Sequence, residues 1–250
     1  MLLTADIGNT SITLGLFDDN AIVEKFRLAS DKDLSLEEYE VLLKSLLKDF
    51  YIDGCIISSV VEELTKKFNN AIVNTCKIKP IIVSTDLNTG IKIKIDNIKE
   101  LGADRIANAA GAYVLYSTPV IVIDFGTATS FDILNENGEF VGGIIAPGIN
   151  LQLKTLNKFT SKLPRIDAAN SPKAIGTNTV DAILSGVIRG CAAMIDGMIE
   201  QCEFELKQKA TIIATGGYAS IVSQYLKRPF DLINPTLTLE GLRHLYYLNS

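Results

Sequence analysis

The sequence predicts an α/β protein made of two similar halves. An apolar run that leads into Asp-x-Gly occurs twice, at residues 1–10 and again at residues 119–128. Patterns typical of strands alternate with patterns typical of helices along the chain, which favours mixed sheets with flanking helices. The length of 250 residues is enough for one large domain or two small ones with a substantial core.

The internal repeat extends beyond Asp-x-Gly. The first copy reads M-L-L-T-A-D-I-G-N-T-S-I-T-L-G-L, and the second reads P-V-I-V-I-D-F-G-T-A-T-S-F-D-I. In both copies small hydroxyl residues and an alternating run follow the glycine. A polar turn, at 18–20 or at 135–138, then joins two strand-like runs, as in a β-hairpin. We therefore expect each half to open with three antiparallel strands.

Helical patterns follow the strands in both halves. Residues 35–50 open with the capping box Ser35-x-x-Glu38 and continue with apolar residues at helical spacing. We expect further elements at 55–61 (strand), 102–116 (helix), 179–206 (long helix), 210–215 (strand), 218–227 (helix) and 239–248 (helix). The Tyr-Ser-Thr-Pro break at 116–119 predicts domains at 1–116 and 117–250, with a cleft between the halves.

Composition excludes several classes of function. Lys and Arg number 24 against 29 Asp and Glu, a net charge of −5, which gives no general electrostatic attraction to nucleic acid or to an anionic membrane. We expect no apolar run near the roughly 18–20 residues that are needed to cross a bilayer. Four scattered cysteines and the single His244 do not form a zinc pattern, and reduced thiols suit the cytoplasm. With one histidine, proton transfer is expected to depend on carboxylates, Lys or Tyr.

The two Asp-x-Gly turns are candidate phosphate-binding loops. In the turn from Asp6 to Thr10, backbone amides and the Asn and Thr side chains suit phosphate oxygens, and the carboxylate suits Mg²⁺. An ordinary hairpin turn is the alternative for one copy alone. The second copy, from Asp124 to Ser130, carries three hydroxyl residues within four positions. The duplication favours a nucleotide site.

Gly102-Ala103-Asp104-Arg105 is a candidate substrate segment at the start of a helix. One interpretation is a helix cap with a surface ion pair. The other gives Arg105 a substrate carboxylate and makes Asp104 the base that accepts a hydroxyl proton. Thr215-Gly216-Gly217, at a predicted strand-to-helix turn, is compatible with a phosphate or a flat ring, or with a turn alone.

These motifs, in this order, resemble the type III pantothenate kinases, a family in the superfamily of acetate kinase, sugar kinases, Hsc70 and actin. The segments that carry the resemblance are D-I-G-N-T from Asp6, R-L-A-S-D-K-D from Arg27, E-L-G-A-D-R from Glu100, D-F-G-T-A-T-S from Asp124, G-G-I-I-A-P-G-I-N from Gly142, I-G-T-N-T from Ile175, I-A-T-G-G from Ile213 and L-T-L-E-G-L-R from Leu237. The family often has Asn-Pro before the Glu100 segment, where this chain has Asn97-Ile98.

The resemblance implies duplicated ribonuclease H-like domains and ATP-dependent phosphorylation of the primary hydroxyl of pantothenate, the first step towards coenzyme A. Asp104 would be the catalytic residue. ATP, with Mg²⁺ near Asp6, would contact Asp6, Ile7, Gly8, Asn9, Thr10, Ser11, Ile12, Thr13 and Thr127. The substrate would contact Gly102, Ala103, Asp104, Arg105 and Thr179, and Asp124 would bind K⁺ or NH₄⁺.

The resemblance also implies a homodimer in which Thr179 reaches the pantothenate site of the partner. The stretch 179–206 carries apolar residues on several faces, which fits a core helix or a subunit interface. In a chain this short we favour the interface, in a two-fold symmetric dimer. We expect a cytoplasmic protein without nucleic-acid or membrane partners. Two alternatives remain: a non-catalytic regulator of the Bvg accessory factor type, which the intact Asp104 disfavours, and another small-molecule kinase of the superfamily.

Overall fold

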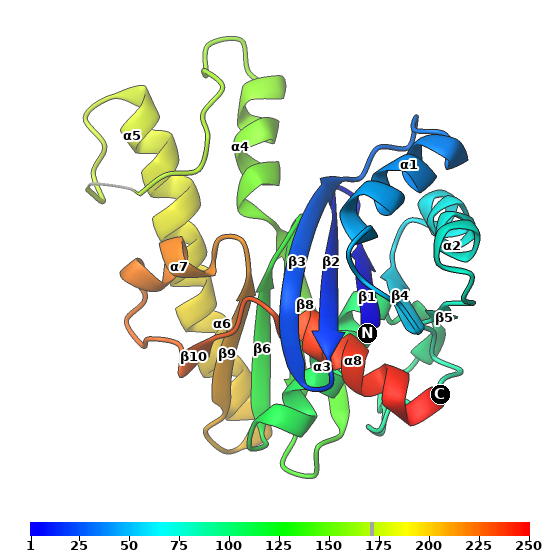
Figure 1. The fold of residues 1–250 in the computed structure, drawn as a ribbon. Helices are drawn as coiled ribbons and strands as arrows, with labels where there is room; N and C mark the ends of the chain where they lie inside the picture. The colour runs from blue at the N-terminus through cyan, green and yellow to red at the C-terminus, as the bar shows by residue number, and fades with distance from the viewer. Residues whose placement is uncertain (171–172) are drawn as a thin grey trace. The chain divides into compact units, whose positions relative to one another are not determined.

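The computed structural model describes residues 1–170 and 173–250. The chain forms two compact units, unit 1 from Met1–Leu115 with Thr236–Ser250 and unit 2 from Tyr116–Pro235. Each contains a five-stranded mixed sheet with flanking helices (Figure 1). The strand orders are β3-β2-β1-β4-β5 and β8-β7-β6-β9-β10. The repeat in the sequence is therefore a repeat of topology, and the predicted fold class is confirmed.

The sheet of unit 1 opens with the expected antiparallel strands β1 (Leu2–Ile7), β2 (Ser11–Asp18) and β3 (Ala21–Ala29). β4 (Gly54–Ser59) pairs in parallel with β1, and the short β5 (Ile81–Ile82) pairs in parallel with β4. The carboxyl ends of β1 and β4 therefore lie side by side. This edge of the sheet is where open α/β folds bind ligands.

Helices α1 (Leu36–Leu47) and α2 (Glu62–Cys76) cover one face of this sheet, where Tyr39 and Phe68 pack with ring centroids 5.8 Å apart. The predicted capping box is present: Ser35 Oγ accepts from the Glu38 amide at 3.2 Å, and the Ser35 amide donates to Glu38 Oε2 at 2.8 Å. The sequence thus predicted the start of α1 from two side chains.

Helices α3 (Ala103–Leu115) and α8 (Leu237–Asn249) pack together in unit 1. α8 lies on the sheet face opposite α1 and α2, where Leu239 approaches Gly15, a residue paired with Thr4. The expected boundary, 1–116 and 117–250, therefore differs from the observed one mainly at the last helix. α8 joins unit 1 because its apolar side packs against α3 and β1.

Unit 2 repeats this plan. β6 (Val120–Phe125), β7 (Ala128–Leu134) and β8 (Phe140–Pro147) are antiparallel, as predicted. β9 (Thr211–Gly216) pairs in parallel with β6, and β10 (Leu232–Ile233) pairs in parallel with β9. The carboxyl ends of β6 and β9 are neighbours, as are those of β1 and β4 in unit 1.

The long helical stretch of unit 2 consists of α5 (Thr179–Leu184), a π-helical turn (Ser185–Arg189) and α6 (Gly190–Leu206). By length and composition, Thr179–Leu206 is apolar enough to cross a membrane, and half of its most apolar window is buried. Its buried side chains pack with β6, β7 and β9 in the core of unit 2. A core helix accounts for this apolar character.

Four further helical segments occur in the described part of the two units. α4 (Ile149–Lys158) and α7 (Ala219–Val222) belong to unit 2, and a short 3₁₀ turn, Ile98–Glu100, precedes α3 in unit 1. A second 3₁₀ turn, Ser223–Tyr225, follows α7. The helix expected at 218–227 is therefore shorter than its sequence pattern suggested.

Candidate active site

Asp6 lies at the carboxyl end of β1, between two hydroxyl residues on the neighbouring strands. It is directly opposite Thr13 on β2 and Ser58 on β4. Ser58 is fully buried, and its Oγ donates to Asp6 Oδ1 at 3.0 Å. The sheet therefore holds the Asp6 carboxylate at the ligand-binding edge with a defined hydrogen bond.

The turn after Asp6 is ordered by backbone and side-chain hydrogen bonds. The Gly8 amide donates to Ser11 O at 3.0 Å, and Ser30 Oγ donates to Gly8 O at 2.6 Å. The Ser30 amide donates to Thr10 O at 3.2 Å. Asn9 and Thr10 lie exposed at the tip of this turn. A rigid turn with an exposed amide and hydroxyl side chain can present donors to phosphate oxygens.

The residues predicted to bind ATP in this region differ in accessibility. Ile7 and Ile12 are fully buried in the core, so they could contribute to a nucleotide site through their backbones only. Ser11 and Thr13 are half-buried on β2, and an Arg27 guanidinium nitrogen donates to Ser11 Oγ at 3.2 Å. The side chains that can meet a ligand at the turn are therefore the polar ones.

Asp104 lies in the first turn of α3. The Gly102 carbonyl accepts the first helical hydrogen bond, from the Ile106 amide at 3.1 Å, and Asp104 Oδ1 accepts from the Arg105 amide at 2.8 Å. Burial raises the pKa of Asp104, while the hydrogen bond from Arg105 and the charge of Arg105 act in the opposite direction. A half-buried carboxylate with a raised pKa is a better proton acceptor than an exposed one.

Asp104 and the Asp6 turn both lie near the carboxyl end of β4. A Cβ added to Gly102 would lie 2.6 Å from Asp104 Oδ1 and 3.8 Å from Val60 Cγ1, so Gly102 lies close to both the carboxylate and Val60. The Val60 amide, just beyond β4, donates to Ile7 O at 3.2 Å. Unit 1 therefore brings Asp6 and Asp104, far apart in sequence, to the end of β4.

Two residues in this arrangement escaped the sequence-based prediction. Ser58 and Val60 were recognised as the end of a predicted strand, but no role was given to either. Val60 is an exposed apolar side chain close to Gly102, with 43% of its surface accessible. Parallel pairing of β1 with β4 was the missing information, because it is a non-local property.

Asp124 in unit 2 occupies the position equivalent to Asp6. It is opposite Ser130 on β7 and Thr215 on β9. The Gly217 amide donates to Phe125 O at 3.1 Å, as the Val60 amide donates to Ile7 O in unit 1. The Gly126 amide donates to Ala128 O at 3.0 Å, which makes this turn one residue tighter than the first. Thr127 is exposed on it.

Two glycines shape the surroundings of the Asp124 turn. Gly216 has φ +85°, and a Cβ there would lie 2.6 Å from Asp124 Oδ1. A Cβ on Gly148 would collide with the carbonyl oxygen of Thr127. This same oxygen accepts a hydrogen bond from the Gly148 amide at 3.1 Å. Both glycines allow backbone to lie directly against the turn, which a larger residue would displace.

Thr179 is the first residue of α5 and is exposed. Asn178 caps this helix, with its Oδ1 accepting from the Asp181 amide at 2.9 Å. Of the predicted site residues, Asp124, Thr127 and Thr179 thus belong to unit 2, and the others belong to unit 1.

Within the described residues, no three His, Cys, Asp or Glu side chains gather into a metal-binding cluster. Mg²⁺ in nucleotide sites is commonly held by one or two carboxylates together with phosphate oxygens and water. The single carboxylate at the Asp6 turn fits that mode, in which most ligands arrive with the nucleotide.

The two units, each a five-stranded mixed sheet with flanking helices, have the fold of the actin and sugar-kinase superfamily. MreB 5 of Spiroplasma citri bound to AMPPNP has a TM-score of 0.55 at 13% identity, over 97% of this chain and 94% of that one. The structure of a Baf family transcriptional activator from Campylobacter jejuni gives a TM-score of 0.62 at 21% identity, over 97% of this chain and 96% of that one. At these identities the likeness is one of fold.

Sequence comparison gives the family. The type III pantothenate kinase profile matches residues 2–201. A type III pantothenate kinase of Dehalococcoides mccartyi strain CBDB1 is 42% identical over all of this chain and 96% of its own length. One from Moorella thermoacetica is 38% identical over the full length of both. The chain belongs to the type III pantothenate kinase family.

Proposed function

We propose that this protein transfers the γ-phosphoryl group of ATP to the primary hydroxyl of pantothenate, giving 4′-phosphopantothenate in coenzyme A biosynthesis. The choice of ATP and pantothenate as the two substrates follows from membership of the type III pantothenate kinase family. The observation that carries the proposal is the position of Asp104, a carboxylate with a raised pKa at the strand end that also holds the Asp6 turn.

Asp104 accepts the hydroxyl proton. As the pantothenate oxygen bonds to the γ-phosphorus, the bond from that phosphorus to the β,γ-bridging oxygen breaks, and ADP leaves. The proton of the hydroxyl passes to the Asp104 carboxylate. Phosphoryl transfer of this kind depends chiefly on positioning and charge neutralisation. The hydrogen bond between Asp104 and the Arg105 amide fixes the carboxylate for this role.

The Asp6 turn binds the ATP phosphates. Asn9 and Thr10 offer exposed donors, Gly8, Ser11 and Thr13 line the turn, and Ile7 and Ile12 contribute backbone groups. Asp6 holds Mg²⁺ directly or through water, and Mg²⁺ supplies charge neutralisation of the phosphates when it is bound with the nucleotide.

Arg105 binds the carboxylate of pantothenate. Its planar guanidinium suits a carboxylate, and it lies in the first turn of α3, where the helix dipole favours a negative charge. Gly102 and Ala103 contribute backbone contacts beside it. Asn97-Ile98, which replaces the family's Asn-Pro, lies in the segment that leads into this turn. Asn97 caps the 3₁₀ turn there, with its Oδ1 accepting from the Lys99 amide at 3.3 Å.

Asp124 binds a monovalent cation, K⁺ or NH₄⁺, and Thr127 contacts a phosphate. The support is chemical: the carboxylate lies between the hydroxyl residues Ser130 and Thr215 on adjacent strands, and Thr127 is exposed on the following turn. Oxygen ligands of this kind suit hard cations.

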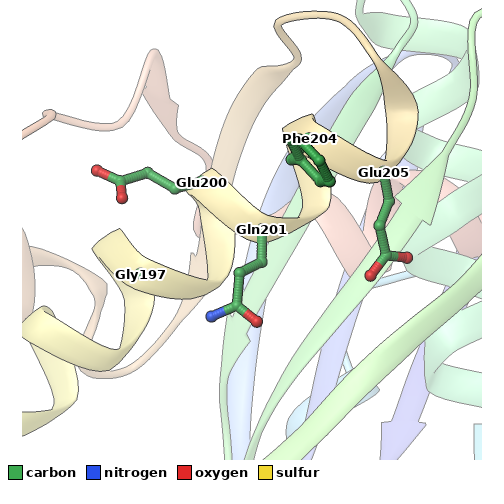
Figure 2. A pocket seen from close by; sticks show the side chains of 5 residues that line it. All are labelled: Gly197, Glu200, Gln201, Phe204 and Glu205. Atoms are coloured by element: carbon green, nitrogen blue, oxygen red, sulfur yellow. The ribbon is translucent and has the colours of Figure 1, made fainter.

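The protein forms a homodimer, and Thr179 contributes to the partner's pantothenate site. The apolar residues of 179–206 that suggested an interface mostly belong to the core of unit 2. The exposed face of this stretch instead carries small residues, Ala182, Gly186, Gly190 and Ala193, and continues to Phe204, which is 83% exposed. Figure 2 shows Phe204 beside Gln201 and Glu205 at the hollow near the end of α6. Such a face suits close approach of a second copy.

Release of ADP, coupled to a spectrophotometric assay, tests the function with pantothenate against a panel of sugars and acetate. Turnover with pantothenate alone is expected. Turnover with a sugar or acetate instead would identify another small-molecule kinase, and no turnover with any acceptor would favour a regulator like the Bvg accessory factor. We propose a cytoplasmic location, where ATP and reduced thiols such as the four free cysteines occur.

A further inference from the structure

We propose that Ser58 is a positioning residue for Asp6: its hydroxyl holds the carboxylate in the orientation that receives Mg²⁺ and the ATP phosphates. This inference rests on the proposed role of Asp6. Ser58 contributes no atom to the ligand itself, because it is fully buried beneath the strand end.

The hydrogen bond is built by the sheet. Parallel pairing of β1 with β4 places Ser58 directly opposite Asp6, and Ser58 Oγ donates to Asp6 Oδ1 at 3.0 Å. Neither partner can be shifted along its strand without changing the register of the whole pair, from Leu2 opposite Gly54 to Ile7 opposite Ser59. The backbone thereby fixes the donor, and the donor fixes one oxygen of the carboxylate.

One oxygen of Asp6 is thus engaged by Ser58, which restricts rotation of the carboxylate about its side-chain bonds. A hydrogen bond from a neutral donor to an ionised acceptor is among the stronger ones in proteins. Loss of the donor should therefore weaken the binding of the metal-bound nucleotide more than that of pantothenate.

The repeat in unit 2 supports the inference independently. Thr215 on β9 stands opposite Asp124, as Ser58 on β4 stands opposite Asp6, and Thr215 is 3% exposed. A buried hydroxyl residue thus occurs at the same position of both sheets. Apolar side chains at these two positions would pack equally well in the cores beside β4 and β9. We therefore infer that the hydroxyl groups are there to interact with the neighbouring carboxylates.

The test compares Ser58→Ala with Ser59→Ala. Ser59 is the matched control because its hydroxyl bonds to Thr65 and to the backbone of Val61 instead of to Asp6. Activity is measured as a function of Mg²⁺ at fixed ATP, and binding of Mg²⁺ with a non-hydrolysable ATP analogue is measured by calorimetry. Ser58→Ala should weaken the Mg²⁺-dependent binding about tenfold, with the KM for pantothenate changed less than twofold and Ser59→Ala close to wild type.

A double-mutant cycle with Asp6→Asn separates positioning from general damage. If Ser58 acts through Asp6, adding Ser58→Ala to Asp6→Asn should cause no further loss of Mg²⁺-dependent binding. An equal loss in both backgrounds, or a Ser58→Ala variant with wild-type Mg²⁺ dependence, would overturn the inference. Asp6→Asn with unchanged Mg²⁺ dependence would instead overturn the proposed role of Asp6.

Ser58→Cys covers the case in which Ser58→Ala is poorly folded. The thiol is close to the hydroxyl in size and a weak donor, so the loss of Mg²⁺-dependent binding should be intermediate and the thermal midpoint should stay near that of the wild type. A Cys variant that binds the metal-bound nucleotide as well as the wild type would contradict the inference.

Discussion

Gly241 of α8 lies directly against Ala107 of α3. A Cβ on Gly241 would collide with the Ala107 carbonyl oxygen and would lie 3.1 Å from the Gly111 amide nitrogen. Nearby, Thr238 Oγ1 donates to Asn108 Oδ1 at 2.7 Å. Because α3 begins with the Asp104 turn, the last helix of the chain supports the element that carries the proposed base.

Gly241→Ala should destabilise the protein by about 1–3 kcal/mol, since overpacking forces two backbones apart. At this chain length, that corresponds to a fall in the thermal midpoint of roughly 2–12 °C. Gly217→Ala is the control for the thermal midpoint, because a Cβ there meets nothing within 4 Å. Equal thermal midpoints for the Gly241→Ala variant and the wild type would show that α3 and α8 can separate without cost.

Asp104→Asn should lower kcat roughly 10²–10⁴-fold, the usual range for a general base, with little change in ATP binding. Asparagine keeps the shape of the side chain but cannot accept the hydroxyl proton. Steady-state kinetics check this, and near-normal turnover would leave Asp104 as a helix-capping residue only.

The same variant has a pH signature in stability. Burial raises the pKa of Asp104 above its ordinary value of 3.8. Below that value the carboxyl group is protonated in both the folded and the unfolded chain. As the pH rises through the pKa of Asp104 in the folded protein, the buried carboxylate becomes charged and the wild type loses stability. The neutral Asp104→Asn side chain does not ionise, so the variant does not lose this stability. Asp104→Asn should therefore raise the thermal midpoint at pH 7 relative to the wild type, by a margin that shrinks towards pH 4. A constant margin at all pH values would contradict the burial effect.

Val60→Thr should raise the KM for pantothenate about fivefold to twentyfold and leave the KM for ATP unchanged. The hydroxyl that is phosphorylated belongs to a carbon next to a dimethyl-substituted one, so an exposed apolar side chain near the Gly102 segment favours this substrate. Replacing a methyl group with a hydroxyl costs about 1–2 kcal/mol of such contact. Val23→Thr on β3 is the control, because Val23 is 44% exposed, close to the 43% of Val60.

Activity should fall when K⁺ is replaced by Na⁺ or by a large organic cation at equal ionic strength, because we place a monovalent cation at Asp124. Asp124→Asn should reduce the difference between the K⁺ and Na⁺ rates. Initial rates in matched buffers check both statements. Equal wild-type rates in K⁺ and Na⁺ would reject the cation site.

Mixing subunits tests whether sites are shared. Thr179→Val and Asp104→Asn are each expected to be poorly active alone. In a mixed dimer, one site would carry both changes and the other would regain both wild-type groups, so activity should partly return. Light scattering provides the assembly control, since one chain has a mass of 27.2 kDa. A fully active monomer, or exchanged subunits without recovered activity, would argue against Thr179 acting in the partner's site.

Local patterns in the sequence were sufficient for most of the fold. The repeated Asp-x-Gly turns, the polar hairpin turns and the Ser35 capping box each depend on residues close together in the chain. Their agreement gave two sheets that open with three antiparallel strands, and the structure confirms both. Asp6 and Asp104 were singled out in the same way, from residue type and local spacing.

The parts that the sequence left open depend on contacts between distant segments. The sequence predicted a helix at 239–248 and assigned it to the second half, but its packing against α3, with Gly241 close to Ala107, places it in unit 1. The role inferred for Ser58 follows from parallel register between β1 and β4, and no local pattern encodes register between strands so far apart. Periodicity likewise identified the apolar residues of 179–206, yet the packing of unit 2 placed most of them in a core, because a buried side chain has the same sequence signature whatever surface covers it.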